Sequence, residues 1–189
     1  MNYFKGLVDK KYMSAVPIEN LFESGRATFK FDGAWEVNTI YQSYPDVNLG
    51  VAPYIVGDNW DGEKYTPTGS WTYAASSETE NIEGATELVK WMRGVEIGLV
   101  LFEKTKSLPS TYAAYELISL FSEDENYKAL YEQLRDYGHP RPKTPVYPQL
   151  SSMFQQSLEN IALNGKNVEE QLDKATERIN DKLERYIRG

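Results

Sequence analysis

Apolar and polar positions follow two different periods along the chain. Residues 27–31 (ATFKF) alternate apolar and polar side chains, the two-residue period of a half-buried strand. Residues 47–56 and 70–76 are two further strand candidates, separated by a loop over 57–68 that is rich in Asp, Gly and Pro. From Asn81 onward the apolar spacing becomes helical. The pattern therefore predicts strands early in the chain and helices in the rest.

Helices are also predicted around the first strand. Residues 3–13 carry apolar positions at helical spacing, and residues 18–25 suggest a second short helix that ends at a glycine. After Asp32-Gly33, residues 34–41 favour another helix. Pro45 marks its end, because the residue before a proline avoids the helical region.

The second half of the chain contains several helix signals. Trp91 falls within an amphipathic pattern and is expected in the core. Leu108-Pro109 introduces a further helix, and Ser122 with Glu125 three residues later forms a capping box. The last helix is predicted to start at the Asn167 cap. Its apolar stripe comprises Val168, Leu172, Ala175, Ile179 and Leu183.

A proline-rich segment, residues 137–148 (YGHPRPKTPVYP), interrupts these helices. Its four prolines favour an extended path, and Pro148 suits the first position of the following helix. This segment is expected to cross between two bodies of the protein.

Composition excludes several functions. The 189 residues carry a net charge of -8, with 28 acidic and 20 basic side chains and no basic run, so nucleic acid is not an expected partner. No stretch is apolar and long enough for a signal peptide or a membrane span. Cysteine is absent, which excludes disulfides and thiolate chemistry.

Candidate catalytic groups are sparse. His139 is the single histidine, and a structural role is favoured for it. Asp58, Asp61 and Glu63 lie together and leave open a hydrolase with paired carboxylates, although a polar turn is the simpler interpretation. The same loop lacks the spacing of a calcium site. No catalytic residue, metal or cofactor is predicted.

Aromatic residues at the ends of predicted elements are the more informative feature. Trp35 follows the first strand, Trp60 lies in the loop, Trp71 begins the third strand, and Phe154 lies near a helix start. A pyranose presents a face of C–H groups, for which an indole plane is a natural receptor, while polar groups at the rim read the hydroxyls. These positions suggest a carbohydrate-binding surface.

The order of segments resembles one known family. The matching segments are LFESGRATFKFDGAW, VNLGVAPYIV, TGSWTYAASSETENIEGATELVKWM, KSLPSTYAAY and the stretch from Arg141 to Ile179. They are similar to the second half of bacterial extracellular solute-binding proteins of carbohydrate ABC transporters (family 1, which includes maltose-binding protein). The first half of the full protein is expected to be absent.

The resemblance implies a fold and its division. It implies an α/β, helix-rich chain that is the C-terminal portion of a two-lobed periplasmic-binding-protein (type II) fold closing by hinge motion. Residues 1–65 and 138–189 would form the C-terminal lobe, and residues 66–137 a helical portion of the N-terminal lobe. YTPTGSW and GHPRPKTP would be two of the hinge crossings.

The resemblance also implies ligand-binding residues in an inter-lobe cleft. Trp35 matches a tryptophan that stacks on sugar, and Phe154 matches a second stacking aromatic. Ser70 replaces the usual second glycine beside Gly69, which weakens the match there. The full expected set is Trp35, Trp71, Gly69, Arg141, Phe154, Asp32 and Tyr147.

The implied function is non-enzymatic. The chain would belong to a protein that binds an oligosaccharide and delivers it to the permease subunits of an ABC importer. It would be extracellular or periplasmic, with the full-length protein a lipoprotein held at the membrane only by its lipid anchor. The alternatives are a carbohydrate-active hydrolase and a helical interaction module. Unpaired strand edges also favour dimerisation.

Overall fold

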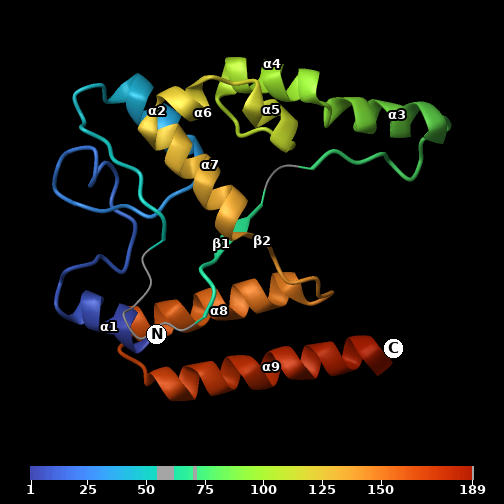
Figure 1. Cartoon of the computed structure of the whole chain (residues 1–189). Helices are drawn as coiled ribbons and strands as arrows, with labels where there is room; N and C mark the ends of the chain where they lie inside the picture. The colour runs from blue at the N-terminus through green and yellow to red at the C-terminus, as the bar shows by residue number, and fades with distance from the viewer. Residues whose placement is uncertain (55–61, 70–71, 189) are drawn as a thin grey trace. The chain divides into compact units, whose positions relative to one another are not determined.

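The structure is a computed structural model that describes residues 1–54, 62–69 and 72–188 (Figure 1). By its internal contacts the chain divides into two compact units, Leu21–Arg141 and Met1–Asn20 together with Pro142–Gly189. One boundary between them falls within the proline-rich segment. These contact units are not the expected lobes, residues 1–65 with 138–189 and residues 66–137, and that lobe division stays a prediction.

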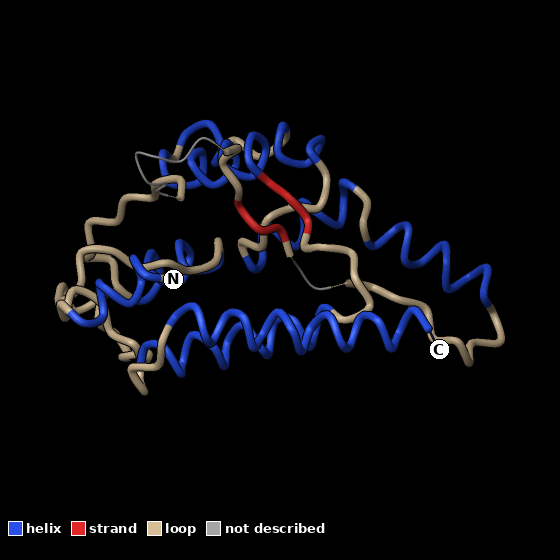
Figure 2. The backbone as a smooth tube through the Cα atoms, turned by 90° about the horizontal axis from the view of Figure 1, so that it is seen from below, coloured by secondary structure: helices blue, strands red, loops and turns tan. Residues whose placement is uncertain are grey.

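The larger unit, Leu21–Arg141, is built mainly of helices. In chain order its described elements are α2 (Trp35–Ser43), β1 (Thr66–Thr68), α3 (Ile82–Met92), α4 (Val95–Thr105), α5 (Tyr112–Glu116), α6 (Leu120–Glu123), α7 (Glu125–Tyr137) and β2 (Gly138–Pro140). The strands β1 and β2 pair in parallel, with Thr66 opposite Gly138 and Thr68 opposite Pro140 (Figure 2).

An aromatic cluster forms the core of this unit. Val37 of α2, Phe102 of α4, Tyr115 of α5, Phe121 of α6 and Tyr127 of α7 are all at most 5% exposed. The aromatic rings of α4, α5, α6 and α7 contact one another in tilted and edge-on arrangements, the geometry that aromatic quadrupoles favour. Helices distant in sequence are thereby joined into one body.

The cap of α7 differs from the sequence prediction. Asp124, and not Ser122, caps this helix by accepting hydrogen bonds from the backbone amides of Asn126 and Tyr127. The Ser122 hydroxyl donates instead to the carbonyl of Ser119. Both residue types suit a cap, but the break after α6 places the carboxylate of Asp124 at the first free amides.

The smaller unit consists of α1 (Asn2–Asp9), α8 (Tyr147–Ala162) and α9 (Val168–Arg188). Helices α8 and α9 lie side by side (Figure 1). Asn167 caps α9 as predicted, its Oδ1 accepting from the Glu170 amide at 3.0 Å. Pro148 is the second residue of α8, one place later than predicted.

The predicted stripe of α9 is half-buried, while the rest of this helix is mostly exposed. Ile161 of α8 is fully buried, and the Ser157 hydroxyl donates to the Met153 carbonyl within α8. Burial of a single apolar stripe is what the 3.6-residue period of this helix requires.

The strand predictions were wrong wherever the structure describes them. Residues 27–31 form an irregular segment outside any strand, with Phe29 76% and Phe31 67% exposed. The described parts of 47–56 and 70–76 are not strands either. Alternation shows that a segment could pair, but a strand also needs a hydrogen-bonding neighbour. The paired strands lie instead in the two segments expected to be hinge crossings.

Two further predictions were wrong. Residues 18–25 form hydrogen-bonded turns that end at Gly25, which has φ of 72°, and not an α-helix. Trp91, expected in the core, is 55% exposed because α3 packs mainly on α4 and leaves much of its apolar side open. Within the described residues, no helix has the length and apolarity needed to cross a membrane.

Candidate functional site

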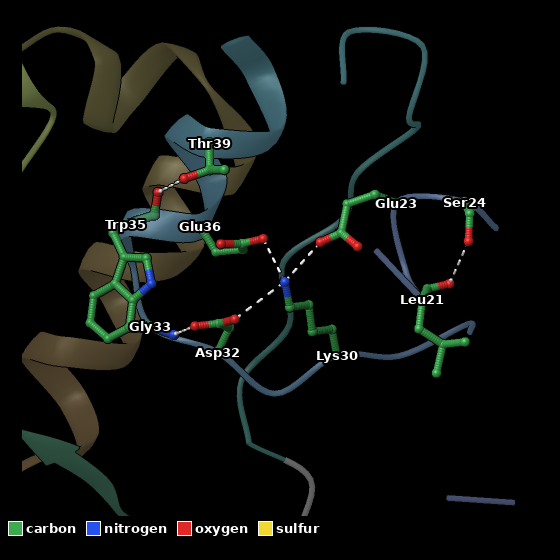
Figure 3. Close-up of polar contacts among 9 residues, drawn as sticks. All are labelled: Leu21, Glu23, Ser24, Lys30, Asp32, Gly33, Trp35, Glu36 and Thr39. Carbon is green, nitrogen blue, oxygen red and sulfur yellow. Dashed lines mark hydrogen bonds and ion pairs between the residues drawn. The ribbon is translucent and has the colours of Figure 1, made fainter. Parts of the chain in front are cut away.

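Trp35 is an exposed indole at the first position of α2. The side chain is 68% exposed although the helix that carries it is anchored by the buried Val37 and Ile40. The six-membered part of the indole lies directly against Gly33 (Figure 3). A rigid helix therefore presents a largely accessible aromatic ring, which is what a stacking platform requires.

Gly33 has a steric role in this arrangement. A Cβ atom at this position would lie 2.2 Å from Cη2 and Cζ3 of Trp35 and 2.5 Å from Cε3. Such distances are impossible for carbon atoms in contact, so the ring holds its position only because residue 33 has no side chain.

A cluster of charges lies on residues 23–36, on both sides of Trp35 in the sequence. Lys30 Nζ is 2.8 Å from Glu23 Oε1, 2.6 Å from Glu36 Oε1 and 3.3 Å from Asp32 Oδ2 (Figure 3). The hydrogen bond from Lys30 holds the pKa of the Glu23 carboxyl below its ordinary value. The first turn of α2 also favours the negative charge of Glu36.

Asp32, a predicted rim residue, is partly committed to this cluster. Its Oδ1 accepts from the Gly33 amide at 2.7 Å and its Oδ2 faces Lys30, while 29% of the side chain is exposed. The carboxylate therefore shapes the loop under Trp35 and keeps some capacity to accept a ligand hydroxyl.

Helix α2 is tied to the aromatic core by a polar network at its far end. The Tyr41 hydroxyl donates to Asp124 Oδ2 at 2.9 Å and accepts from Asn126 Nδ2 at 2.8 Å. Asn126 also accepts from the Val51 amide at 2.7 Å. Burial, and secondarily the Asp124 carboxylate, raise the pKa of Tyr41 despite the opposing hydrogen bond from Asn126. Trp35 thus stands on a helix with limited freedom to tilt.

Gly69 and Arg141 lie together at the ends of the paired strands β1 and β2. A Cβ atom on Gly69 would be 3.4 Å from an amino nitrogen of Arg141, so the guanidinium lies over this glycine. Tyr65, directly before β1, stacks on His139 of β2 with the ring centroids 5.0 Å apart. The Tyr65 hydroxyl also donates to the Pro140 carbonyl. His139 is half-buried in this stack, as a structural histidine would be.

The remaining predicted residues fall in other places. Phe154 and Tyr147 both lie on α8 in the smaller unit, seven residues apart and therefore on one face. Phe154 is 51% exposed and Tyr147 is half-buried. Trp71, like Trp60, lies outside the described residues. The structure thus brings Asp32 together with Trp35, and Gly69 together with Arg141.

The alternative carboxylate site falls mostly on residues that the structure does not describe. Asp58 and Asp61 lie outside the described residues, and Glu63 is exposed. Among the residues that are described, no group of three or more His, Asp or Glu side chains is arranged to hold a metal ion.

Sequence reasoning did not select Gly33, Lys30 and Glu36 as site residues. The strand pattern only marked Lys30 as a polar position, and a turn explained Gly33. A signal was available in the five charged residues among the fourteen positions 23–36 around Trp35, but the pattern cannot show that three acids share one lysine.

Two comparisons relate the chain to known proteins. Residues 6–97 match the family model described as bacterial extracellular solute-binding protein. The structure is also similar to that of the sugar-binding protein MalE from the phytopathogen Xanthomonas citri, with a TM-score of 0.76 and 17% sequence identity. This match covers 98% of the present chain and 49% of that protein. The chain therefore spans about half the length of the protein that it matches.

These findings confirm the predicted relationship and fold class. The helix-rich structure has the fold of part of a type II periplasmic binding protein, because the match to MalE extends over nearly the whole chain. The family's description as extracellular agrees with the expected extracellular or periplasmic location. Residues 6–97 thus match the family of bacterial extracellular solute-binding proteins, and the expected resemblance is confirmed over this part of the chain.

Proposed function

We propose that the chain belongs to the carbohydrate-binding component of an ABC sugar importer and that Trp35 is a stacking platform for an oligosaccharide. The observation that supports this proposal most directly is the 68% exposure of Trp35 on a helix anchored in the core. Covering a large exposed indole with a ligand removes apolar surface from water, which is favourable. Binding proteins place such rings on rigid elements. The relatives' descriptions as solute-binding and sugar-binding point to the same ligand class.

The surroundings of Trp35 favour a neutral sugar. The C–H face of a pyranose can lie on the indole, while the exposed part of Asp32 accepts hydrogen bonds from hydroxyls at the rim. Glu36 and Asp32 carry negative charge beside the ring, which disfavours acidic sugars. The further proposed contacts are the Arg141 guanidinium near Gly69, and Trp71, Phe154 and Tyr147.

Delivery to a permease follows from this role. An importer's binding component hands its ligand to membrane subunits, so the proposed macromolecular partners are ABC permease subunits. We propose a lipid anchor in the full-length protein as the link to the membrane. No enzymatic step is part of this function, and the matched family and the matched MalE protein are both described as binding proteins.

Calorimetric titration with a panel of neutral oligosaccharides (maltotriose, cellotriose, xylotriose and raffinose) tests the proposal. Binding of at least one sugar is expected, with Trp35→Ala weakening it about tenfold or more, since the loss of an aromatic stack costs roughly 1–3 kcal/mol. Trp91→Ala is the matched control, because Trp91 is also exposed but lies on α3. Equal affinity of Trp35→Ala and wild type contradicts the proposal.

Recovery of the sugar separates binding from hydrolysis. Labelled oligosaccharide incubated with the protein is expected to be recovered intact. Released shorter products would support the carboxylate hydrolase instead.

A further inference from the structure

Lys30 has an unusual set of neighbours. Its ammonium lies within hydrogen-bond distance of Glu23 and Glu36 and within ion-pair distance of Asp32 (Figure 3). The side chains of these three acids are 5%, 16% and 29% exposed, respectively. One cation therefore holds three largely covered carboxylates from three separate positions: a turn, a loop and the first turn of α2.

The cluster depends on the ammonium. Three carboxylates around one point repel each other, and partly covered charges are stabilised only when they are paired and hydrogen-bonded. Partial burial alone lowers the pKa of Lys30, but the hydrogen bonds to the three acids outweigh this effect and raise it. Lys30 is thus charged throughout the physiological range, and without it the acids would separate.

A continuous chain of contacts leads from Lys30 to the ring of Trp35. Asp32 faces Lys30 with Oδ2 and accepts from the Gly33 amide with Oδ1 at 2.7 Å. The Gly33 carbonyl accepts from the Glu36 amide at 3.1 Å, and the indole lies on Gly33 itself. Because Lys30 also binds the Glu36 carboxylate, it fixes both sides of the short segment that carries the ring.

We infer that Lys30 is a positioning residue for the sugar platform: by holding Asp32 and Glu36 it fixes the Gly33 backbone against which Trp35 rests. This inference rests on the proposed function of Trp35. Lys30 itself need not touch the ligand. Its three acidic partners all lie within residues 23–36, outside the aromatic core around Phe102, so its removal is expected to loosen the loop and leave the core intact.

The position of Trp35 can be followed in the free protein by ¹⁹F NMR with 5-fluorotryptophan. The Trp35 resonance is assigned as the one lost in Trp35→Phe. In Lys30→Met this resonance is expected to shift or broaden while the Trp91 resonance stays in place, and Lys30→Arg is expected to restore it. The matched control is Lys90→Met, which removes a lysine paired with Glu87 at 2.7 Å on α3.

An unmoved Trp35 resonance in folded Lys30→Met overturns the inference, as does an equal shift of all tryptophan resonances, which indicates a general structural change. Should circular dichroism show that Lys30→Met does not fold, Glu36→Gln decides the question. This variant keeps the shape of the side chain and weakens the link at α2. A Trp35 resonance unmoved in Glu36→Gln then overturns the inference.

Sugar titration adds the functional result and keeps the two proposals apart. For a sugar that wild type binds, Lys30→Met is expected to weaken binding about fivefold, the upper range for loss of partly exposed ion pairs. In the background Trp35→Ala the same change is expected to have no further effect, because the platform is already gone. If wild type binds no sugar, only the proposed function is refuted. The ¹⁹F result still decides whether Lys30 positions Trp35.

Discussion

The contact between Gly33 and Trp35 allows a sharp test of how the platform is built. In Gly33→Ala the new methyl group would lie 2.2 Å from two ring carbons of Trp35. The backbone at Gly33 does not have a positive φ, so alanine can adopt its conformation. The perturbation is therefore a steric displacement of one ring.

The size of the displacement follows from the contact distance. Ordinary carbon contacts begin near 3.4 Å, so the ring must retreat by at least about 1.2 Å or rotate away from the loop. Trp35 is exposed and can move toward solvent without opening the core, so the free energy of unfolding is expected to change by less than about 1 kcal/mol. Stacking, in contrast, depends on the position of the ring, and we expect sugar affinity to fall about tenfold.

Two measurements on the same sample check this expectation. Urea denaturation gives the free energy of unfolding, and calorimetric titration gives the affinity for a sugar bound by wild type. Gly50→Ala is the matched control: Gly50 lies in the same unit, and a Cβ atom there meets no other atom within 4 Å. Its affinity is expected to equal that of wild type.

The result that refutes the reasoning is a Gly33→Ala variant with wild-type affinity and an unmoved Trp35 resonance. A large loss of stability would also be inconsistent, because it would mean that the ring cannot move outward and that Trp35 belongs to the packed structure.

Further predictions concern stability. Asp124→Ala removes the cap of α7 and is expected to lower the free energy of unfolding by about 1–2 kcal/mol in urea denaturation. Ile161→Ala, at a fully buried position, should cost about 2–5 kcal/mol, whereas Ile187→Ala, at a side chain 73% exposed, should cost far less; similar losses would contradict the packing of α8. Because the bond from Lys30 lowers the pKa of Glu23, its stabilisation is present above pH 4.5 and lost as pH falls through the folded-state pKa. Glu23→Gln should therefore have a lower free energy of unfolding than wild type at neutral pH, and the two proteins should become equally stable in acid.

The sequence identified some elements correctly because their signals are local. The Asn167 cap and the apolar stripe of α9 are read from neighbouring positions, and the helix after Gly33 ends where Pro45 requires it. The choice of Trp35 as an accessible aromatic also came from the sequence, because Trp35 follows the end of a predicted strand, and the residue is exposed although that strand does not form. Its contact with sugar stays a prediction.

The failures share one physical cause. Strand formation in residues 27–31 and the burial of Trp91 both depend on a neighbour supplied by another part of the chain, and a one-dimensional pattern does not show whether that neighbour is present. The cap of α7 was missed for a related reason. Ser122 and Asp124 have similar propensities, and the packing of α6 decided where the helix begins.

The sequence by itself thus determined most of the helical segments, the resemblance to a family and the residue types available for binding, because these depend on local periodicity and on the order of short motifs. Only the tertiary structure decided that Lys30 joins three acids, that Gly33 supports the indole and that Arg141 lies over Gly69. Charges and rings interact over a few ångströms in space, whatever their separation along the chain, so their partners are fixed only when the chain has folded.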